Sequence, residues 1–201
     1  LYGDDPDFLE EDRRPVPPDG SRTEDWYVGA SPDHPYPIPV VDPARIHPDL
    51  RRQLVPFRGP ERPGMLVVDP GEHFLYVVRE DGTALRYGVG VGRMGFTWSG
   101  VKHISAKKEW PAWTPPPEML ARRPDLPRHM EGGPQNPLGA RALYLFQGDK
   151  DTLYRIHGTM EPWTIGEAVS SGCIRLLNED IYDLHRRVPV GTPVVVRRAA
   201  L

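Results

Sequence analysis

Residues 156–176 read IHGTMEPWTIGEAVSSGCIRL, and the fold of the chain is best predicted from this stretch. It holds Cys173, the single cysteine of the chain, and His157, which lies sixteen positions earlier. That separation is long enough for the chain to loop out and return, so that thiol and imidazole can meet. A thiol becomes a strong nucleophile when a base takes its proton, and imidazole is the usual base. The stretch therefore predicts a Cys–His nucleophilic site.

The residues around Cys173 favour chemistry at the thiol. Ser170, Ser171 and Gly172 precede it, and such small residues allow a tight backbone whose N–H groups can bind an oxyanion. Arg175 follows two positions later, and on an extended chain alternate residues point to the same side. Arg175 can therefore bind a substrate carboxylate or phosphate beside the thiol. A structural salt bridge is the alternative role for this arginine.

Residue types alone leave a second interpretation open. A lone cysteine is most often a small buried hydrophobe, and a lone histidine is most often a satisfied polar residue. Cys173, however, lies among Gly, Ser and Arg rather than among aliphatic residues. The residues by themselves leave both a catalytic and an inert thiol open.

The ordered pattern HGT, IG and SSGCIRL resembles the signature of the L,D-transpeptidase catalytic domain, the YkuD-like family of bacterial cell-wall enzymes. Further segments resemble the same family: GVGVGRMG at 88–95, WPAWTPP at 110–116 and GGPQNPLG at 132–139. The likeness covers residues 64–197. One position departs from the common pattern, because Ser171 stands where many members have a second histidine that is not the base.

This resemblance implies a mainly β fold, a mixed-sheet sandwich or barrel-like domain with short helices and a long Pro- and Trp-rich loop. It implies that Cys173 is the nucleophile, that His157 is the base, and that the carbonyl of Gly158 orients the imidazole. Backbone N–H groups of Gly172 and Cys173 would bind the oxyanion, with Ser170 and Ser171 beside them. Arg175 would shape the cleft or bind a substrate carboxylate.

The resemblance also implies the reaction and its partners. We expect transfer of peptidoglycan stem peptides through an acyl-enzyme, without a metal or an organic cofactor, and inhibition by carbapenems. Three alternatives remain: an L,D-carboxypeptidase on the same fold, an enzyme that attaches an outer-membrane protein to peptidoglycan, and a non-catalytic peptidoglycan-binding domain. The chain begins with Leu1, so we expect a processed or trimmed chain, exported to the periplasm as the family implies.

Composition and residue patterns disfavour some classes of protein. The 201 residues suit one domain plus an extension, and the net charge of −3 gives no indication of nucleic-acid binding. Apolar runs stay shorter than the roughly 18 residues of a membrane helix. The histidines are scattered without a zinc-binding pattern, although a zinc hydrolase remains a minor alternative. The glycine run at 88–92 lacks the following helix that a dinucleotide site requires.

Two parts are expected, an extension over residues 1–63 and a catalytic domain over 64–198. Residues 1–25 carry nine acidic residues against three arginines, which is typical of a solvated arm. Thirteen of the 25 prolines lie in residues 1–63, which disfavours long regular elements there. Within this extension, residues 43–54 are expected to include a short helix with Asp49 near its start.

In the catalytic part, three strand-like runs from Met65 to Val91 are separated by Pro-Gly and Asp-Gly, which predicts an antiparallel meander. Further strands are expected at 102–110, 140–147, 152–157 and 193–197. A helix is expected over 178–188, with Asn178 as its cap and acidic residues in the first turn. Residues 110–138 contain a possible short helix at 115–123 and otherwise predict a long loop that shields the substrate cleft.

Overall fold

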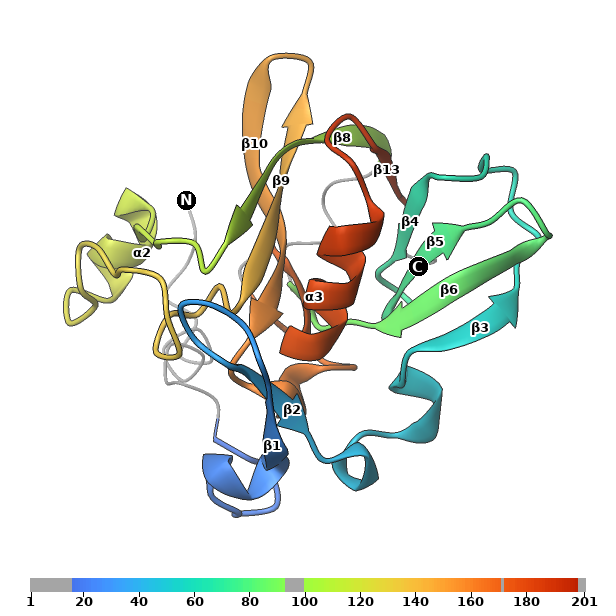
Figure 1. Cartoon of the computed structure of the whole chain (residues 1–201). Helices are drawn as coiled ribbons and strands as arrows, with labels where there is room; N and C mark the ends of the chain where they lie inside the picture. Colours follow the sequence, from blue (N-terminus) through green and yellow to red (C-terminus); the bar gives the residue numbers. More distant parts are fainter. Residues whose placement is uncertain (1–15, 93–99, 171, 199–201) are drawn as a thin grey trace.

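The computed structural model describes residues 16–92, 100–170 and 172–198. These residues form a mainly β structure with two short helices, as expected (Figure 1). The helices are α2 (Pro117–Arg122) and α3 (Asn178–Arg187). The strands are β1 (Tyr27–Ser31), β2 (Ile38–Val41), β3 (Gln53–Pro56), β4 (Leu66–Asp69), β5 (Phe74–Val78), β6 (Thr83–Gly88), β7 (Val91–Gly92), β8 (Gly100–Glu109), β9 (Arg141–Gln147), β10 (Lys150–Thr159), β11 (Ala168–Ser170), β12 (Ile174–Leu177) and β13 (Pro193–Val196).

One mixed sheet dominates the fold, with the strand order β12-β10-β9-β8-β13-β4-β5-β6-β3. The meander β4-β5-β6 is antiparallel, as the turn dipeptides predicted, and the expected strands at 140–147 and 152–157 form the antiparallel hairpin β9-β10. Gly82 allows the tight turn between β5 and β6, because its φ of 75° is open to glycine at little cost. Two pairs, β10-β12 and β13-β4, are parallel, and the second joins segments that are far apart in sequence.

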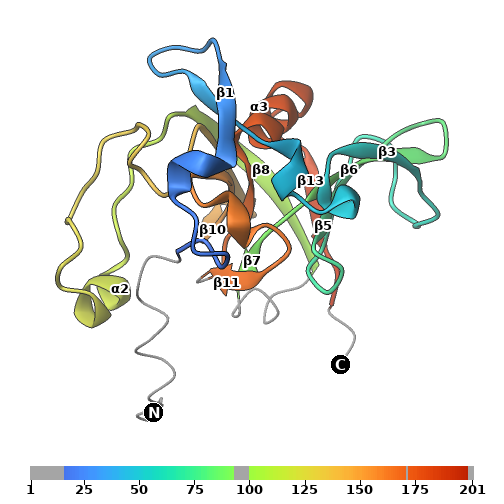
Figure 2. The same cartoon turned by 90° about the horizontal axis from the view of Figure 1, so that it is seen from below.

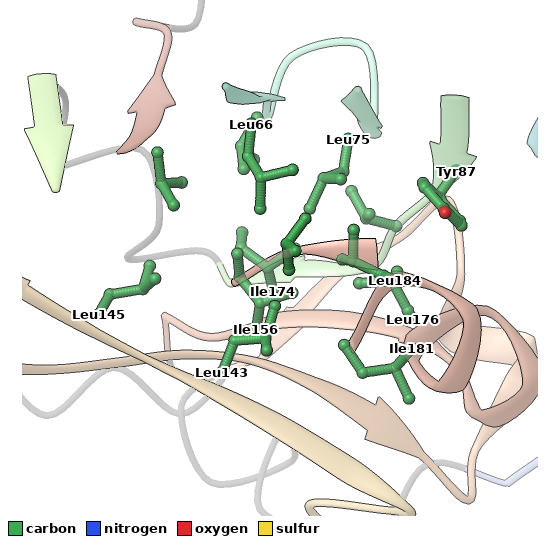
Figure 3. Close-up of a cluster of buried hydrophobic side chains, with 14 of the residues drawn as sticks. Leu66, Leu75, Tyr87, Leu143, Leu145, Ile156, Ile174, Leu176, Ile181 and Leu184 are labelled. Carbon is green, nitrogen blue, oxygen red and sulfur yellow. The ribbon is translucent and has the colours of Figure 1, made fainter. Parts of the chain in front are cut away.

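The two halves of this sheet face each other across one core. Figure 3 shows Leu66 and Leu75, from β4 and β5, on the opposite side of the core from Ile156 and Ile174, of β10 and β12. Helix α3 closes the core with Ile181 and other aliphatic residues, all fully buried. The site described below therefore stands on a rigid, fully packed support.

The proline-rich segment holds more regular structure than expected. The hairpin β1-β2 and the edge strand β3, which pairs with β6, were missed by the sequence analysis. The helix expected at 43–54 is replaced by two single 3₁₀ turns, η2 (Pro43–Arg45) and η3 (Pro48–Leu50), because each proline allows only a first turn. In Figures 1 and 2, β1 and β2 lie beside α3 at one end of the large sheet. The division between an extension and a catalytic domain stays a prediction.

Helix α3 occupies the predicted position, and Glu179 and Asp180 lie in its first turn as expected. The prediction that Asn178 caps the helix is wrong, since Leu177 is the N-cap residue and the helix lacks a side-chain cap. The side chain of Asn178 turns instead toward β10, where it donates to the carbonyl of Thr159 at 2.8 Å. The side-chain amide of Asn178 therefore binds a distant strand instead of capping its own helix.

The loop over residues 110–138 contains α2 and is pinned at its base. Trp110 is buried and donates through Nε1 to Asp33 at 2.8 Å, while its ring meets that of Tyr36 edge to face. Further out, Trp113 and Met130 exchange two backbone hydrogen bonds of 2.8 Å. Trp110 thus packs the loop onto the fold. The predicted shielding of the substrate by this loop stays a prediction.

Candidate active site

The parallel pair β10-β12 sets one face of four polar residues. Its register places His157 opposite Arg175, and Ile156 opposite Ile174. The isoleucines are buried in the core, so the alternating residues point to the other side. That side carries Arg155 and His157 from β10. It also carries Arg175 from β12 and Cys173, the residue directly before β12. We call these four residues the site face.

On the site face, the two sequence-predicted catalytic groups lie on one diagonal and two arginines lie on the other. Cys173 immediately precedes β12 and faces Arg155, whose backbone hydrogen-bonds to the thiol. His157 stands beside Arg175 in the strand register. The fold therefore brings together the cysteine and the histidine that the sequence singled out, and it adds Arg155, which the sequence analysis missed.

The imidazole of His157 is held in one tautomer. Its Nδ1 lies 2.6 Å from the carbonyl oxygen of Gly158, which accepts only, so Nδ1 carries the proton and Nε2 keeps a lone pair. Burial, together with the positive charge of Arg175, lowers the pKa of His157 to about 4. At neutral pH the imidazole is thus neutral, with one nitrogen available to accept a proton.

The thiol of Cys173 is also neutral at rest. Burial raises the pKa of Cys173, and the backbone of Arg155 and the charges of Arg155 and Arg175 offset this rise in part. The residue as a whole keeps an intermediate exposure, although the thiol itself lies in surroundings poor in water. Both groups are therefore neutral at rest. The imidazole takes the proton of the thiol only as the sulfur attacks a substrate.

Arg175 makes a structural ion pair. Its Nη1 lies 2.9 Å from Oε2 of Glu161, and the two side chains are 18% and 24% exposed. Its backbone also exchanges hydrogen bonds of 2.8 and 2.9 Å with Gly90. Of the two roles predicted for this arginine, the salt bridge is present. Its buried Nε lacks a hydrogen-bond partner among the described residues.

Gly172, directly before the thiol, lies in tightly packed backbone. Ser170 ends β11, which pairs in parallel with β7. Ser171 lies outside the described residues. Gly172 has a φ of 116°, and a Cβ there would lie 3.0 Å from the ring of Tyr154, so only glycine fits. The role of the Gly172 and Cys173 N–H groups as oxyanion donors stays a prediction.

The proline-rich segment contacts the loop that follows β10. Tyr27 donates its hydroxyl to the carbonyl of Met160 at 3.1 Å, and Trp26 meets Trp163 edge to face. These aromatic residues share an apolar cluster with Leu177 at the end of β12. The loop that carries Glu161 is thereby fixed from the N-terminal side, a long-range contact without a local sequence signal.

Other features of the described residues fall outside the site face. Two hollows of about 530 and 790 Å³ lie around Pro63 and Gly64 and share no residue with it. The described part of the chain contains no cluster of three or more His, Cys, Asp or Glu residues suited to a metal ion. Within the same residues, no helix has the length and apolarity needed to cross a membrane.

The chain is similar in sequence to a known family of proteins. The sequence model of the family described as YkuD, L,D-transpeptidase catalytic domain, matches residues 63–196. Probable L,D-transpeptidase ErfK/SrfK of Escherichia coli K12 is 39% identical over 140 residues, which cover 65% of this chain and 43% of that protein. A putative L,D-transpeptidase of Fuscovulum blasticum, from the ATP synthase subunits region, is 46% identical over 100 residues, half of each chain. The chain thus spans half or less of these relatives.

A solved structure is also similar. It is described as a probable carnitine operon oxidoreductase from Brucella melitensis, and it is 52% identical to this chain. The match covers 76% of this chain and 96% of that one, with a TM-score of 0.52.

In the present structure, Gly88 ends β6, and Val91 and Gly92 form β7, so most of the glycine run over residues 88–92 is strand backbone rather than a phosphate-binding loop.

Proposed function

The chain belongs to the YkuD family of L,D-transpeptidase catalytic domains, and from that premise we propose that it is a cysteine-dependent L,D-transpeptidase acting on peptidoglycan stem peptides. The observation that carries the proposal is the site face. The β10-β12 register brings Cys173 and His157 to one face, and the Gly158 carbonyl leaves Nε2 of the imidazole as the free base. A thiol and an oriented base are the two groups that acyl transfer requires.

In the first half-reaction, the sulfur of Cys173 attacks the carbonyl carbon that precedes the terminal D-Ala of a tetrapeptide donor. Nε2 of His157 takes the thiol proton as the C–S bond forms. The tetrahedral intermediate then collapses, the amide C–N bond breaks, and His157 gives the proton to the departing D-Ala amine. A thioester on Cys173 remains.

In the second half-reaction, an acceptor amine attacks the thioester. His157 takes a proton from this amine and returns it to the sulfur as the C–S bond breaks. The product is a new amide, and the enzyme is restored with a neutral thiol and a neutral imidazole. The lowered pKa of His157 and the raised pKa of Cys173 support such a cycle, because both resting groups are uncharged.

The two arginines of the site face are the proposed contacts for substrate carboxylates. Arg175 already pairs with Glu161, and Arg155 makes a bidentate pair with Asp151, at 2.7 and 2.8 Å. Each guanidinium is therefore held in place before substrate arrives. Stem peptides carry carboxylates, and guanidinium N–H groups are well suited to bind them.

The acceptor decides between the variants of this function. Water as the acceptor gives an L,D-carboxypeptidase, and a lysine of an outer-membrane protein gives an anchoring enzyme. Export to the periplasm and inhibition by carbapenems are parts of the same proposal. A non-catalytic peptidoglycan-binding domain would leave Cys173 unreactive toward any of these compounds.

Product analysis tests the proposal. Purified protein is incubated with a tetrapeptide muropeptide, and the products are separated and weighed by mass spectrometry. Cross-linked dimers, formed by the wild type and lost in Cys173→Ser, are the expected result. Tripeptide as the sole product at every acceptor concentration would indicate the carboxypeptidase, and unchanged substrate would contradict an enzyme acting on this donor.

A further inference from the structure

Asn178 lies behind the site face, with its side chain fully engaged. The residue is 2% exposed. Its Oδ1 accepts from the N–H of Ala140 at 2.9 Å, and its Nδ2 donates to the carbonyl of Thr159 at 2.8 Å and to the sulfur of Met160 at 3.0 Å. One amide thus ties the start of α3 to the end of β10 and to the residue before β9.

Two glycines allow this amide to lie where it does. A Cβ on Gly158 or on Gly139 would collide with Oδ1 of Asn178. Gly139 also has a φ of 64°, which favours glycine. The amide of Asn178 is therefore packed directly against the backbone of Gly158, without a side chain between them.

Gly158 is the residue that orients the base. Its carbonyl accepts from Nδ1 of His157 at 2.6 Å, and the next carbonyl along the strand, that of Thr159, is the one that Asn178 holds. A rotation of the peptide plane between Gly158 and Thr159 would turn the Gly158 carbonyl away from the imidazole of His157. The hydrogen bonds and the packing of Asn178 oppose such a rotation.

We propose that Asn178 is a positioning residue for His157, which holds the Gly158 backbone so that the imidazole keeps its proton on Nδ1 and its lone pair on Nε2. The inference rests on the proposed role of the Cys–His pair. Asn178 touches neither the substrate nor the sulfur of Cys173 in this account and acts only through Gly158 and His157.

The chemistry of the amide suggests the informative substitution. Asn178→Asp keeps the shape and the acceptor for Ala140, but it replaces the donor to Thr159 with an oxygen. An ionised carboxylate would repel that carbonyl, whereas a protonated carboxyl could donate to it. The defect of Asn178→Asp should therefore lessen as the pH falls.

The chain offers a matched control in its other asparagine. Asn136 is 1% exposed, donates through Nδ2 to the carbonyls of Pro111 and Glu131, and accepts from the N–H of Leu138. It lies in the loop over residues 110–138, away from the site face in sequence and in its contacts. Asn136→Asp therefore costs a similar set of buried hydrogen bonds without touching Gly158.

The experiment measures acylation of Cys173 by a carbapenem, with its rate constant separated from its binding constant. Folding is followed by thermal melting, and the tautomer of His157 by ¹⁵N NMR. For Asn178→Asp we expect the rate constant to fall about tenfold to a hundredfold at pH 8, as for other displaced catalytic groups, with binding unchanged and the single Nδ1–H tautomer lost. Asn136→Asp should lower the melting temperature but keep the wild-type rate and tautomer.

A folded Asn178→Asp protein with the wild-type rate and tautomer would overturn the inference. If that variant does not fold, Asn178→Ser takes its place under the same criteria, because a smaller polar side chain avoids the buried charge. A wild-type protein that resists the carbapenem would count against the proposed function. The tautomer measurement would then still decide whether Asn178 orients the imidazole.

Discussion

At the residue scale, the environment of each group decides what it can do. His157 and Cys173 were identifiable from sequence because HGT and SSGCIRL place rare residue types at a characteristic spacing. Their protonation could not be predicted, because it depends on burial and on two arginines that the strand register brings beside them. Arg155 and Glu161 were missed for the same reason, since an ion pair or a cross-strand neighbour leaves no local pattern.

The pH dependence of acylation follows from the pKa of His157. A base acts only when it is deprotonated, and burial lowers the pKa of His157 to about 4. Acylation should therefore stay constant from pH 8 to pH 5 and fall only near pH 4, provided that circular dichroism shows a folded protein. His157→Ala should lower the plateau by about a hundredfold or more.

The control for this profile is His185, a second buried histidine whose pKa burial also lowers to about 4. His185→Gln should keep both the plateau and the fall near pH 4. A fall centred near pH 6.5 in the wild type would mean that the imidazole is solvated. Alkylation by iodoacetamide at mildly acidic pH is the weaker test, because a thiol with a raised pKa reacts slowly even in an active enzyme.

Asp180 predicts a pH-dependent stability. Burial, opposed by Arg52, raises the pKa of Asp180 from 3.8 to about 7. Between these values the folded state binds a proton that the unfolded state does not, so the free energy of unfolding falls as the pH rises. Asp180→Asn should therefore stabilise the protein at pH 8, by up to about 4 kcal/mol before the lost contact with Arg52 is counted, and by less at pH 5.

Urea unfolding at both pH values measures this difference. Asp183→Asn is the control, because that carboxylate accepts from Tyr87 and pairs with Arg52 at 2.9 Å and with Arg187. Burial opposes its ionisation, yet these partners hold the pKa of Asp183 below its usual range. Asp183→Asn should destabilise the protein at pH 8. An equal effect of both substitutions would contradict the assignment.

At the element scale, local signals predicted local structure. The meander β4-β5-β6, the hairpin β9-β10, β13 and α3 follow from turn dipeptides and from periodic apolar residues. The strands β1, β2 and β3 were hidden by prolines such as Pro39 and Pro56, which lie in or end short strands. The parallel pairing of β10 with β12 had no local signal, although it builds the site face.

We expect the loop over residues 110–138 to affect the balance between transfer and hydrolysis. Replacing residues 117–128 by two glycines removes α2 and keeps the backbone pair between Trp113 and Met130. If the loop excludes water from the thioester, the ratio of tripeptide to cross-linked dimer should rise in the shortened protein. Carbapenem acylation at the wild-type rate serves as the control for an intact site. An unchanged product ratio would remove the shielding role.

At the scale of the whole molecule, the proline-rich segment and the large sheet are joined by buried contacts. Asp33 makes a bidentate pair with Arg141 at 2.9 Å, and the two side chains are 12% and 3% exposed. Trp26 and Val41 pack against Leu177 in a shared cluster. These contacts predict that the described parts unfold together, a property that the sequence could not indicate because its proline content suggested a separate arm.

Asp33→Asn tests this coupling. Removing the charge of Asp33 leaves Arg141 with only the more distant carboxylate of Glu109, 3.9 Å from its Nε, and breaking a buried pair typically costs about 3–5 kcal/mol. Urea unfolding should show one transition, shifted to a lower midpoint. Asp125→Asn breaks the more exposed pair with Arg123 and should leave the midpoint of unfolding nearly unchanged. Two separate transitions in the wild type would contradict a single cooperative unit.

The central claim, that Cys173 carries the acyl group, is tested most directly by trapping the intermediate. Wild-type protein and a tetrapeptide muropeptide are mixed, quenched in acid within the first turnover, and analysed by intact mass and peptide mapping. The predicted result is one adduct with the mass of the donor less D-alanine, on the peptide that contains Cys173. It should be absent in Cys173→Ser and slower to form in His157→Ala. Product formation by Cys173→Ser within about tenfold of the wild-type rate would contradict the claim.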